Sequence, residues 1–253
     1  MQRILLKHGV TLAYHDEGQG KPVLLLHGFT GTARSHMGLL IDDLRLDRRV
    51  IAPDLRGYGA SRPPERDFPP DFYQRDAQDM AHLIEQLGVG PVSVIGFSDG
   101  AESAILLAAH YPDRVTKLVA FGVSGVISAP MAAAAQRWLP VSAWGPERAE
   151  WRAEIIADQG EERIEPLVVG WAAAAQAIRA AGGNICYQES AQVRCPTLLI
   201  NGDGELYNLP EDFARLAARI PKARAEIIAQ SSHVIQLDQP ARLRSMIRAF
   251  LAE

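Results

Sequence analysis

Five short apolar runs, separated by stretches of helical periodicity, constrain the fold of this chain more than any other feature. The runs are residues 23–26, 50–52, 92–95, 118–121 and 197–200. Short runs that are apolar throughout are typical of strands buried on both faces of a parallel sheet. Helices are expected at about 35–45, 73–87, 99–110, 211–219 and 240–252. This alternation predicts an α/β fold built on a mostly parallel, twisted sheet with flanking helices.

The first residues follow a different pattern. Residues 2–7 and 10–15 alternate apolar and polar side chains around His8-Gly9, which predicts an antiparallel hairpin at an edge of the sheet. The apolar run Ile4–Leu6 is far too short for the hydrophobic region of a signal peptide. No other segment reaches the roughly 20 apolar residues needed to cross a bilayer. We therefore expect a cytoplasmic protein with no membrane partner.

The stretch 125–190 also departs from the alternation. It is rich in alanine, contains all four tryptophans and shows helical periods without a convincing strand. We therefore expect residues 1–124 and 191–253 to form the core, with 125–190 inserted as a helical cap. Prolines should mark where three or four cap helices begin or end, because proline is accepted in a first turn but breaks a helix interior: Pro130, Pro140, Pro146 and Pro166.

Charge and cysteine content exclude several classes of function. The net charge is −4 and there is no long basic block, so nothing suggests a nucleic-acid partner. Cys186 and Cys195 are too few to staple a chain of 253 residues and have no metal-ligand spacing. Motifs for nucleotides, dinucleotides and zinc proteases are absent. We expect no metal and no cofactor, a small-molecule substrate, and an oligomeric state that the sequence leaves open.

The segment VSVIGFSDGAES carries the strongest chemical signal. A buried strand runs into Gly96, Ser98 and Gly100 and directly into a helix, which is GxSxG in the context of a nucleophile elbow. Glycines two positions before and after the serine relieve crowding at so sharp a turn. The first amide of the following helix, that of Asp99, points at the reaction centre and is a candidate oxyanion donor. We expect the Asp99 side chain to stabilise the turn, although it could instead reach a cationic substrate group.

A second oxyanion donor is expected where the strand at 23–26 ends. There the sequence reads LLLHGFTG, so the chain turns sharply above the sheet, and the amide of Phe29 is the one expected to point inward. Loss of one such donor typically lowers turnover by about 100- to 1000-fold. His27 follows the strand directly and is expected to hold this loop in place.

Seven histidines compete for the role of general base that activates Ser98. His233 lies in the polar loop SSH, between a strand candidate and the last helix, at the carboxyl end of the sheet where ligands gather in such folds. The other candidates are placed on the edge hairpin, at the loop already described, or at surface or end positions of helices: His8, His15, His27, His36, His82 and His110. His233 is therefore the predicted base.

An acid that orients the imidazole should follow the strand at 197–200. The segment NGDGELYN offers Asp203 and Glu205, and both satisfy the chain order of serine, acid and histidine. The residues alone do not choose between them.

These motifs resemble the α/β-hydrolase superfamily. HGF at 27, PDLRGYGAS at 53, GFSDG at 96, CPTLLINGDGE at 195 and SSH at 231 follow the usual order and cover essentially the whole chain. GFSDG looks most like the biphenyl-hydrolase-like and valacyclovir-hydrolase-like esterases. The resemblance implies an α/β-hydrolase fold with a cap, a catalytic triad and an oxyanion hole. It favours Glu205 as the acid, three residues beyond Gly202, although aspartate is commoner there and Asp203 stays open.

The resemblance also indicates which reactions of the family need to be considered for this chain. Members with an aspartate nucleophile, such as dehalogenases and epoxide hydrolases, are disfavoured by Ser98, and Asp54 resembles a structural loop residue. The predicted function is a serine esterase for a small apolar ester, thioester or lactone. The cap tryptophans form either the walls of its pocket or the packing of the cap: Trp138, Trp144, Trp151 and Trp171. Two alternatives are carbon-carbon bond hydrolysis or a lyase reaction on the same scaffold, and a slow-turnover small-molecule receptor.

Overall fold

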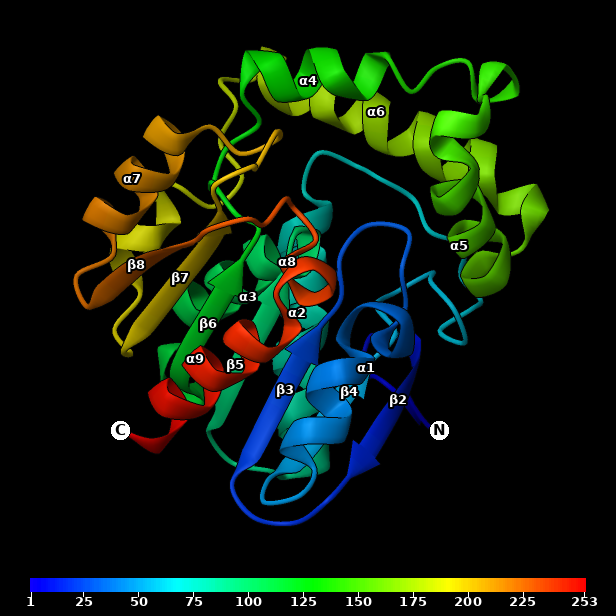
Figure 1. The fold of residues 1–253 in the computed structure, drawn as a ribbon. Helices are drawn as coiled ribbons and strands as arrows, with labels where there is room; N and C mark the ends of the chain where they lie inside the picture. The colour runs from blue at the N-terminus through cyan, green and yellow to red at the C-terminus, as the bar shows by residue number, and fades with distance from the viewer.

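The computed structural model describes all 253 residues and places an eight-stranded sheet at the centre of the molecule (Figure 1). The strand order is β1-β2-β4-β3-β5-β6-β7-β8. Strand β2 is antiparallel to its neighbours β1 and β4, and every other pair is parallel. The α/β class and the edge hairpin are therefore confirmed. The strands are β1 (Gln2–Leu5), β2 (Thr11–Glu17), β3 (Pro22–Leu26), β4 (Arg49–Pro53), β5 (Val92–Phe97), β6 (Val115–Phe121), β7 (Thr197–Gly202) and β8 (Ala223–Ile228).

Helices cover both faces of this sheet. Successive strand residues point to opposite faces, so in β3 Val23 and Leu25 join one apolar cluster while Leu24 and Leu26 join the other. Helices α1 (Ala33–Leu44) and α9 (Pro240–Ala252) cover the first face, with short α8 (Ile235–Asp238) before α9. The second face is covered by α2 (Phe72–Leu87), α3 (Asp99–His110) and α7 (Pro210–Arg219). The five helices expected from the sequence each begin and end within two residues of these bounds.

The segment between β6 and β7 forms three further helices that arch over the carboxyl ends of the strands (Figure 1). They are α4 (Ala129–Gln136), α5 (Ala149–Gln159) and α6 (Ile164–Ala180), and we call this segment the cap. The 3₁₀ segments are Pro112–Arg114, Val141–Ala143, Pro146–Arg148, Glu161–Arg163 and Glu189–Gln192. No helix combines the length and the apolar character required to cross a membrane.

Glu102 of α3 fixes the root of the cap to the core. Its carboxylate is 5 % exposed and accepts hydrogen bonds from the amides of Ser124 (3.2 Å) and Gly125 (2.9 Å), where the cap begins. It also accepts one from the thiol of Cys186 (2.9 Å), where the chain returns. Burial raises the pKa of Glu102 to about 7, against the opposing effect of these three donors. One buried carboxyl thus joins both ends of the cap to α3.

Candidate active site

Ser98 lies at the sharp turn between β5 and α3. Its φ is 53°, a left-handed conformation that costs about 1–3 kcal/mol in a residue other than glycine. A Cβ atom at Gly96 would lie 2.4 Å from the carbonyl of Gly100, and one at Gly100 would lie 2.4 Å from the carbonyl of His27. Only glycine therefore fits on either side of the serine, and the packed turn holds the hydroxyl above the sheet.

The structure brings Ser98, His233 and Glu205 together. The Oγ of Ser98 is 2.9 Å from Nε2 of His233, and Nδ1 of the same ring is 2.7 Å from Oε2 of Glu205. An ionised carboxylate only accepts hydrogen bonds, so Nδ1 carries the proton and Nε2 is left free to accept the proton of Ser98. The arrangement can act chemically as a nucleophile, a general base and an orienting acid.

The carboxylate of Glu205 is held ionised by its surroundings. Burial opposes its ionisation, but hydrogen bonds from His233, the amide of Tyr207 (2.7 Å) and Asn208 outweigh burial and lower the pKa. Asp203 points elsewhere and accepts a hydrogen bond from the amide of Ser231 (3.2 Å). The longer glutamate side chain fits because its carboxylate folds back onto the amides of its own loop.

Two amides near Ser98 are available to an incoming oxyanion. The amide of Phe29 has no acceptor within the protein, and that of Asp99 begins α3, with no preceding turn to which it could donate. His27 supports the loop that carries Phe29. Its Nδ1 donates to the carbonyl of Gly28 (2.8 Å) and its Nε2 accepts from the amide of Leu55 (2.9 Å). Burial lowers the pKa of His27 to about 3, so the ring is neutral.

The sequence suggested that the side chain of Asp99 stabilises its own turn, but in the structure this side chain bonds to other elements. Its carboxylate is 6 % exposed and accepts hydrogen bonds from Tyr73 Oη of α2 (2.8 Å) and Trp171 Nε1 of α6 (2.9 Å). Burial raises its pKa to about 6, although both donors act in the opposite direction. A short side chain next to the nucleophile thus connects the core with the cap, because a cap tryptophan reaches it.

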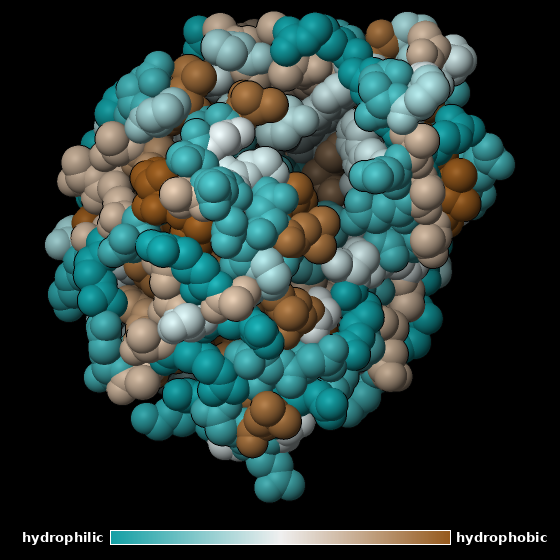
Figure 2. Space-filling model, in the orientation of Figure 1, coloured by the Kyte–Doolittle hydropathy of each residue, from teal (hydrophilic) through white to brown (hydrophobic).

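A cavity of about 420 Å³ opens above Ser98, and Figure 2 shows a hollow between the cap and the core. Three of the four tryptophans line it, whereas Trp144 stacks behind Trp151 with ring centroids 4.8 Å apart. The charged side chains other than histidine in its wall are all carboxylates, and no lysine or arginine lines it. The lining is Phe29, Thr30, His36, Phe97, Ser98, Asp99, Met131, Trp138, Glu150, Trp151, Glu154, Trp171, Tyr207, His233, Val234 and Leu237.

His36 is part of this wall. It lies at the start of α1, which fits the expected helix end, and only the expected alternative of a surface position is wrong. Its side chain is 10 % exposed, its Nδ1 accepts from the amide of Gly28 (3.2 Å), and its Nε2 donates to Glu154 (3.0 Å). A Cβ atom at Gly31 would lie 2.3 Å from the ring. The signal that could have identified His36 is Gly31, because a glycine in a tight loop marks a close approach of another group.

Other features of the molecule do not form a second site of this kind. Asp54 accepts hydrogen bonds from the amides of Ala33 (2.9 Å) and Ala60 (2.9 Å), which fits a structural role. No group of three or more His, Cys, Asp and Glu side chains could hold a metal ion. A hollow of about 560 Å³ at the far end of α3 is lined by Ala109, Ala191, Gln192, Val193, Arg194, Pro221 and Lys222. Its lining contains no serine, threonine, cysteine or histidine side chain.

Comparison with known proteins gives similarities over the whole chain. Residues 23–245 match the model of a family described as the alpha/beta hydrolase family. The chain is 31 % identical to the serine hydrolase BPHL of Mus musculus, over 96 % of this chain and 84 % of the relative. It is 28 % identical to the 2-hydroxymuconate semialdehyde hydrolase of Pseudomonas sp. (strain CF600), over 99 % and 94 %. A solved thermophilic esterase from Thermogutta terrifontis superposes with a TM-score of 0.75 at 27 % identity, over 100 % and 98 %.

Proposed function

The chain is a hydrolase of the α/β-hydrolase family, and on this premise we propose that it cleaves small esters through an acyl intermediate on Ser98. One observation carries the proposal: the hydrogen-bonded series from Glu205 through His233 to Ser98 ends beside two amides that have no partner. Nothing in the packing of the core requires this arrangement, since it places a strained serine and a half-buried histidine next to a cavity.

The geometry defines the proposed steps. Ser98 Oγ attacks the carbonyl carbon while His233 Nε2 takes its proton, and the oxyanion accepts hydrogen bonds from the amides of Phe29 and Asp99. The protonated imidazole, steadied by Glu205, then gives its proton to the leaving alcohol. Water attacks the acyl group with the same base, and the second tetrahedral species releases the acid and restores Ser98.

The cavity favours a neutral or positively charged substrate. Its aromatic walls suit an apolar group of modest size, as in a small ester, thioester or lactone. Asp99, Glu150 and Glu154 would repel an anion, and no cationic side chain of the wall could pair with one. The substrate therefore should carry no free carboxylate.

Carbon-carbon bond hydrolysis is the second candidate, and the similarity to the Pseudomonas hydrolase favours it. The name of that relative describes an organic acid, which is anionic at neutral pH. A carboxylate buried there would need hydrogen-bond donors or a cationic partner, and the wall supplies three carboxylates but no lysine or arginine. The negative charge of the cavity wall thus favours ester hydrolysis over carbon-carbon bond hydrolysis.

The test is to compare turnover of p-nitrophenyl esters of increasing acyl length with turnover of a vinylogous diketone. Ester turnover should fall by about 10⁵-fold or more in Ser98→Ala, and labelling by a fluorophosphonate should disappear with it. Turnover that survives in Ser98→Ala would contradict the proposal. So would a wild-type chain that cleaves the diketone but no ester.

A further inference from the structure

The cap helix α5 contacts the loop that carries Phe29, residues 28–32, which we call the oxyanion loop. The central contact is Gln159, at the end of α5, which is 2 % exposed. Its Nε2 donates to the carbonyls of Thr30 (3.0 Å) and Gly31 (3.1 Å). Its Oε1 accepts from the amide of Gly59 (2.9 Å) on a neighbouring core loop. The side-chain amide thus satisfies two buried carbonyls that follow Phe29 directly.

Thr30 shows why the oxyanion loop needs this support. Its φ is 64°, in the left-handed region that a β-branched residue avoids, and the residue is 1 % exposed. Its Oγ1 donates to the carbonyl of Phe29 (2.7 Å) and accepts from Nε1 of Trp151 on α5 (3.1 Å). A conformation of this kind persists only where surrounding contacts hold it. Here two of the contacts come from the cap.

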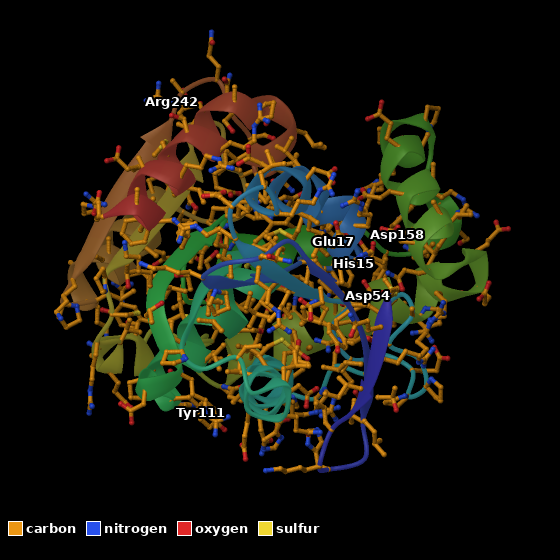
Figure 3. All side chains as sticks on the ribbon, turned by 90° about the horizontal axis from the view of Figure 1, so that it is seen from below. His15, Glu17, Asp54, Tyr111, Asp158 and Arg242 are labelled. Atoms are coloured by element: carbon orange, nitrogen blue, oxygen red, sulfur yellow. The ribbon has the colours of Figure 1, made fainter.

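Further side chains on the same face of α5 reach the core. Glu154 accepts from His36, whose other ring nitrogen accepts from the amide of Gly28. Asp158 approaches the hydroxyl of Thr32 at 3.5 Å, and Figure 3 labels it together with Asp54 of the core. Positions 151, 154, 158 and 159 follow the i, i+3, i+7, i+8 spacing of one helix face. This face of α5 therefore packs on the oxyanion loop and on His36 beside it.

We propose that Gln159 is a positioning residue of the oxyanion hole, so that the cap holds the Phe29 amide in the orientation that receives the oxyanion. The inference rests on the proposed ester hydrolysis at Ser98. Without the Gln159 amide, the carbonyls of Thr30 and Gly31 are buried without donors, and the loop must rotate to find others. A rotation at Thr30 turns the peptide planes beside Phe29. A donor to the oxyanion acts only within a narrow range of positions, about 2.7–3.1 Å from the oxygen.

The expected kinetic signature follows from when the hydrogen bond to the oxyanion forms. The amide of Phe29 interacts more strongly with the tetrahedral species than with the substrate, so its displacement lowers kcat and changes KM little. The affinity for a boronic acid, which forms a tetrahedral adduct with the serine, falls by a similar factor. A role in cap folding alone would instead lower stability and leave both quantities unchanged in the folded protein.

The test measures kcat and KM on p-nitrophenyl acetate, inhibition by phenylboronic acid, and thermal melting. In Gln159→Leu we expect kcat to fall by about 10- to 100-fold, phenylboronic acid to bind correspondingly more weakly, and KM to stay within about threefold. Gln176→Leu is the matched control, because Gln176 also donates to a backbone carbonyl, that of Ala132, but entirely within the cap. It should lie within about twofold of wild type in kcat.

Gln159→Glu keeps the inference testable if the leucine variant does not fold. Glutamate keeps the shape and the acceptor for Gly59 but places an oxygen against the carbonyls of Thr30 and Gly31, so kcat should fall as in Gln159→Leu. Folded Gln159 variants with the kcat and boronic-acid affinity of Gln176→Leu would refute the role of Gln159 alone. A wild-type chain that cleaves no ester would instead refute the proposed function.

Discussion

The two halves of the candidate site are supported in opposite ways. The half that would handle the proton, His233 and Glu205, lies on loops of the core, and Glu205 is held by amides of its own loop. The half that would receive the oxyanion depends on the cap, because Trp151 and Gln159 of α5 hold Thr30 next to Phe29. A displaced cap would therefore leave the base in place and loosen one donor of the oxyanion hole.

The carboxyl groups of the core loops and those that join the core to the cap also differ in the direction of their pKa shifts. Glu205 is surrounded by donors that lower its pKa. The carboxyls that tie the core to the cap, Asp99 and Glu102, are so deeply buried that their pKa values are raised to about 6 and about 7. The folded structure therefore stabilises the ionised form of Glu205 and the protonated forms of Asp99 and Glu102. Mutations and changes of pH should thus affect the two halves of the site differently.

Among variants that keep Ser98, the largest effect is expected from Glu205→Gln, which removes the carboxylate that orients His233. The imidazole then loses the partner that fixes its tautomer, and kcat should fall by about 10³- to 10⁴-fold, or about 4–5 kcal/mol. Asp203→Asn is the control and should change kcat by no more than about twofold. Steady-state kinetics on p-nitrophenyl acetate measure both. A larger loss in the Asp203 variant would transfer the acid role to that residue.

The next effect concerns how stability depends on pH through Glu102, which joins the cap to the core. The folded pKa of Glu102 is about 7, against an ordinary value of 4.5. Its contribution is therefore fully present below about pH 4.5 and is lost as the pH rises through 7, by about 3 kcal/mol in total. Asp99 acts in the same direction. In Glu102→Gln, the free energy of unfolding measured with urea should fall less between pH 5 and pH 8 than in wild type.

Glu226→Gln serves as the control for this prediction, because Glu226 is exposed on β8. It should reproduce the wild-type change between the two pH values. An unchanged pH dependence in Glu102→Gln would mean that Glu102 ionises as readily in the folded chain as in the unfolded chain.

The smallest effect is expected at His36, which supports the oxyanion loop from within the core. His36→Phe keeps an aromatic ring but removes the acceptor for the amide of Gly28, and loss of one hydrogen bond of about 1 kcal/mol should lower kcat by about 5- to 10-fold. Glu154→Gln still accepts from Nε2 of His36, so its kcat should stay within about twofold. Equal kcat values for the two variants would show that the contact with Gly28 has no kinetic role.

The fold could be predicted because its signals are local. Apolar runs and helical periods depend on neighbouring residues, and the nucleophile elbow needs its glycines within five positions, so helices and strands were placed within a few residues. The proximity of Ser98 to His233, 135 positions apart, followed from chain order on a parallel sheet. Glu205 was preferred to Asp203 only through family resemblance, and in the structure Glu205 is the carboxylate that contacts the imidazole of His233.

Contacts between the cap and the core could not be predicted in the same way. The periodicity of residues 149–159 indicates a helix and its apolar face, but not the surface that this face meets. Gln159 therefore looks like an ordinary polar residue in the sequence, and the partner of Asp99 is a tryptophan 72 positions away. The roles of Gln159 and Asp99 depend on how the cap packs on the core, which no local pattern encodes.

The insertion of the cap between β6 and β7 has a consequence for protein engineering. In a chimera that receives the cap of a relative, the walls of the cavity change together with the residues that meet the oxyanion loop. Substrate preference and reaction rate would then change at once, and a poor chimera could be mistaken for one with the wrong specificity. Grafts that retain Gln159 and its contact with the loop should separate the two.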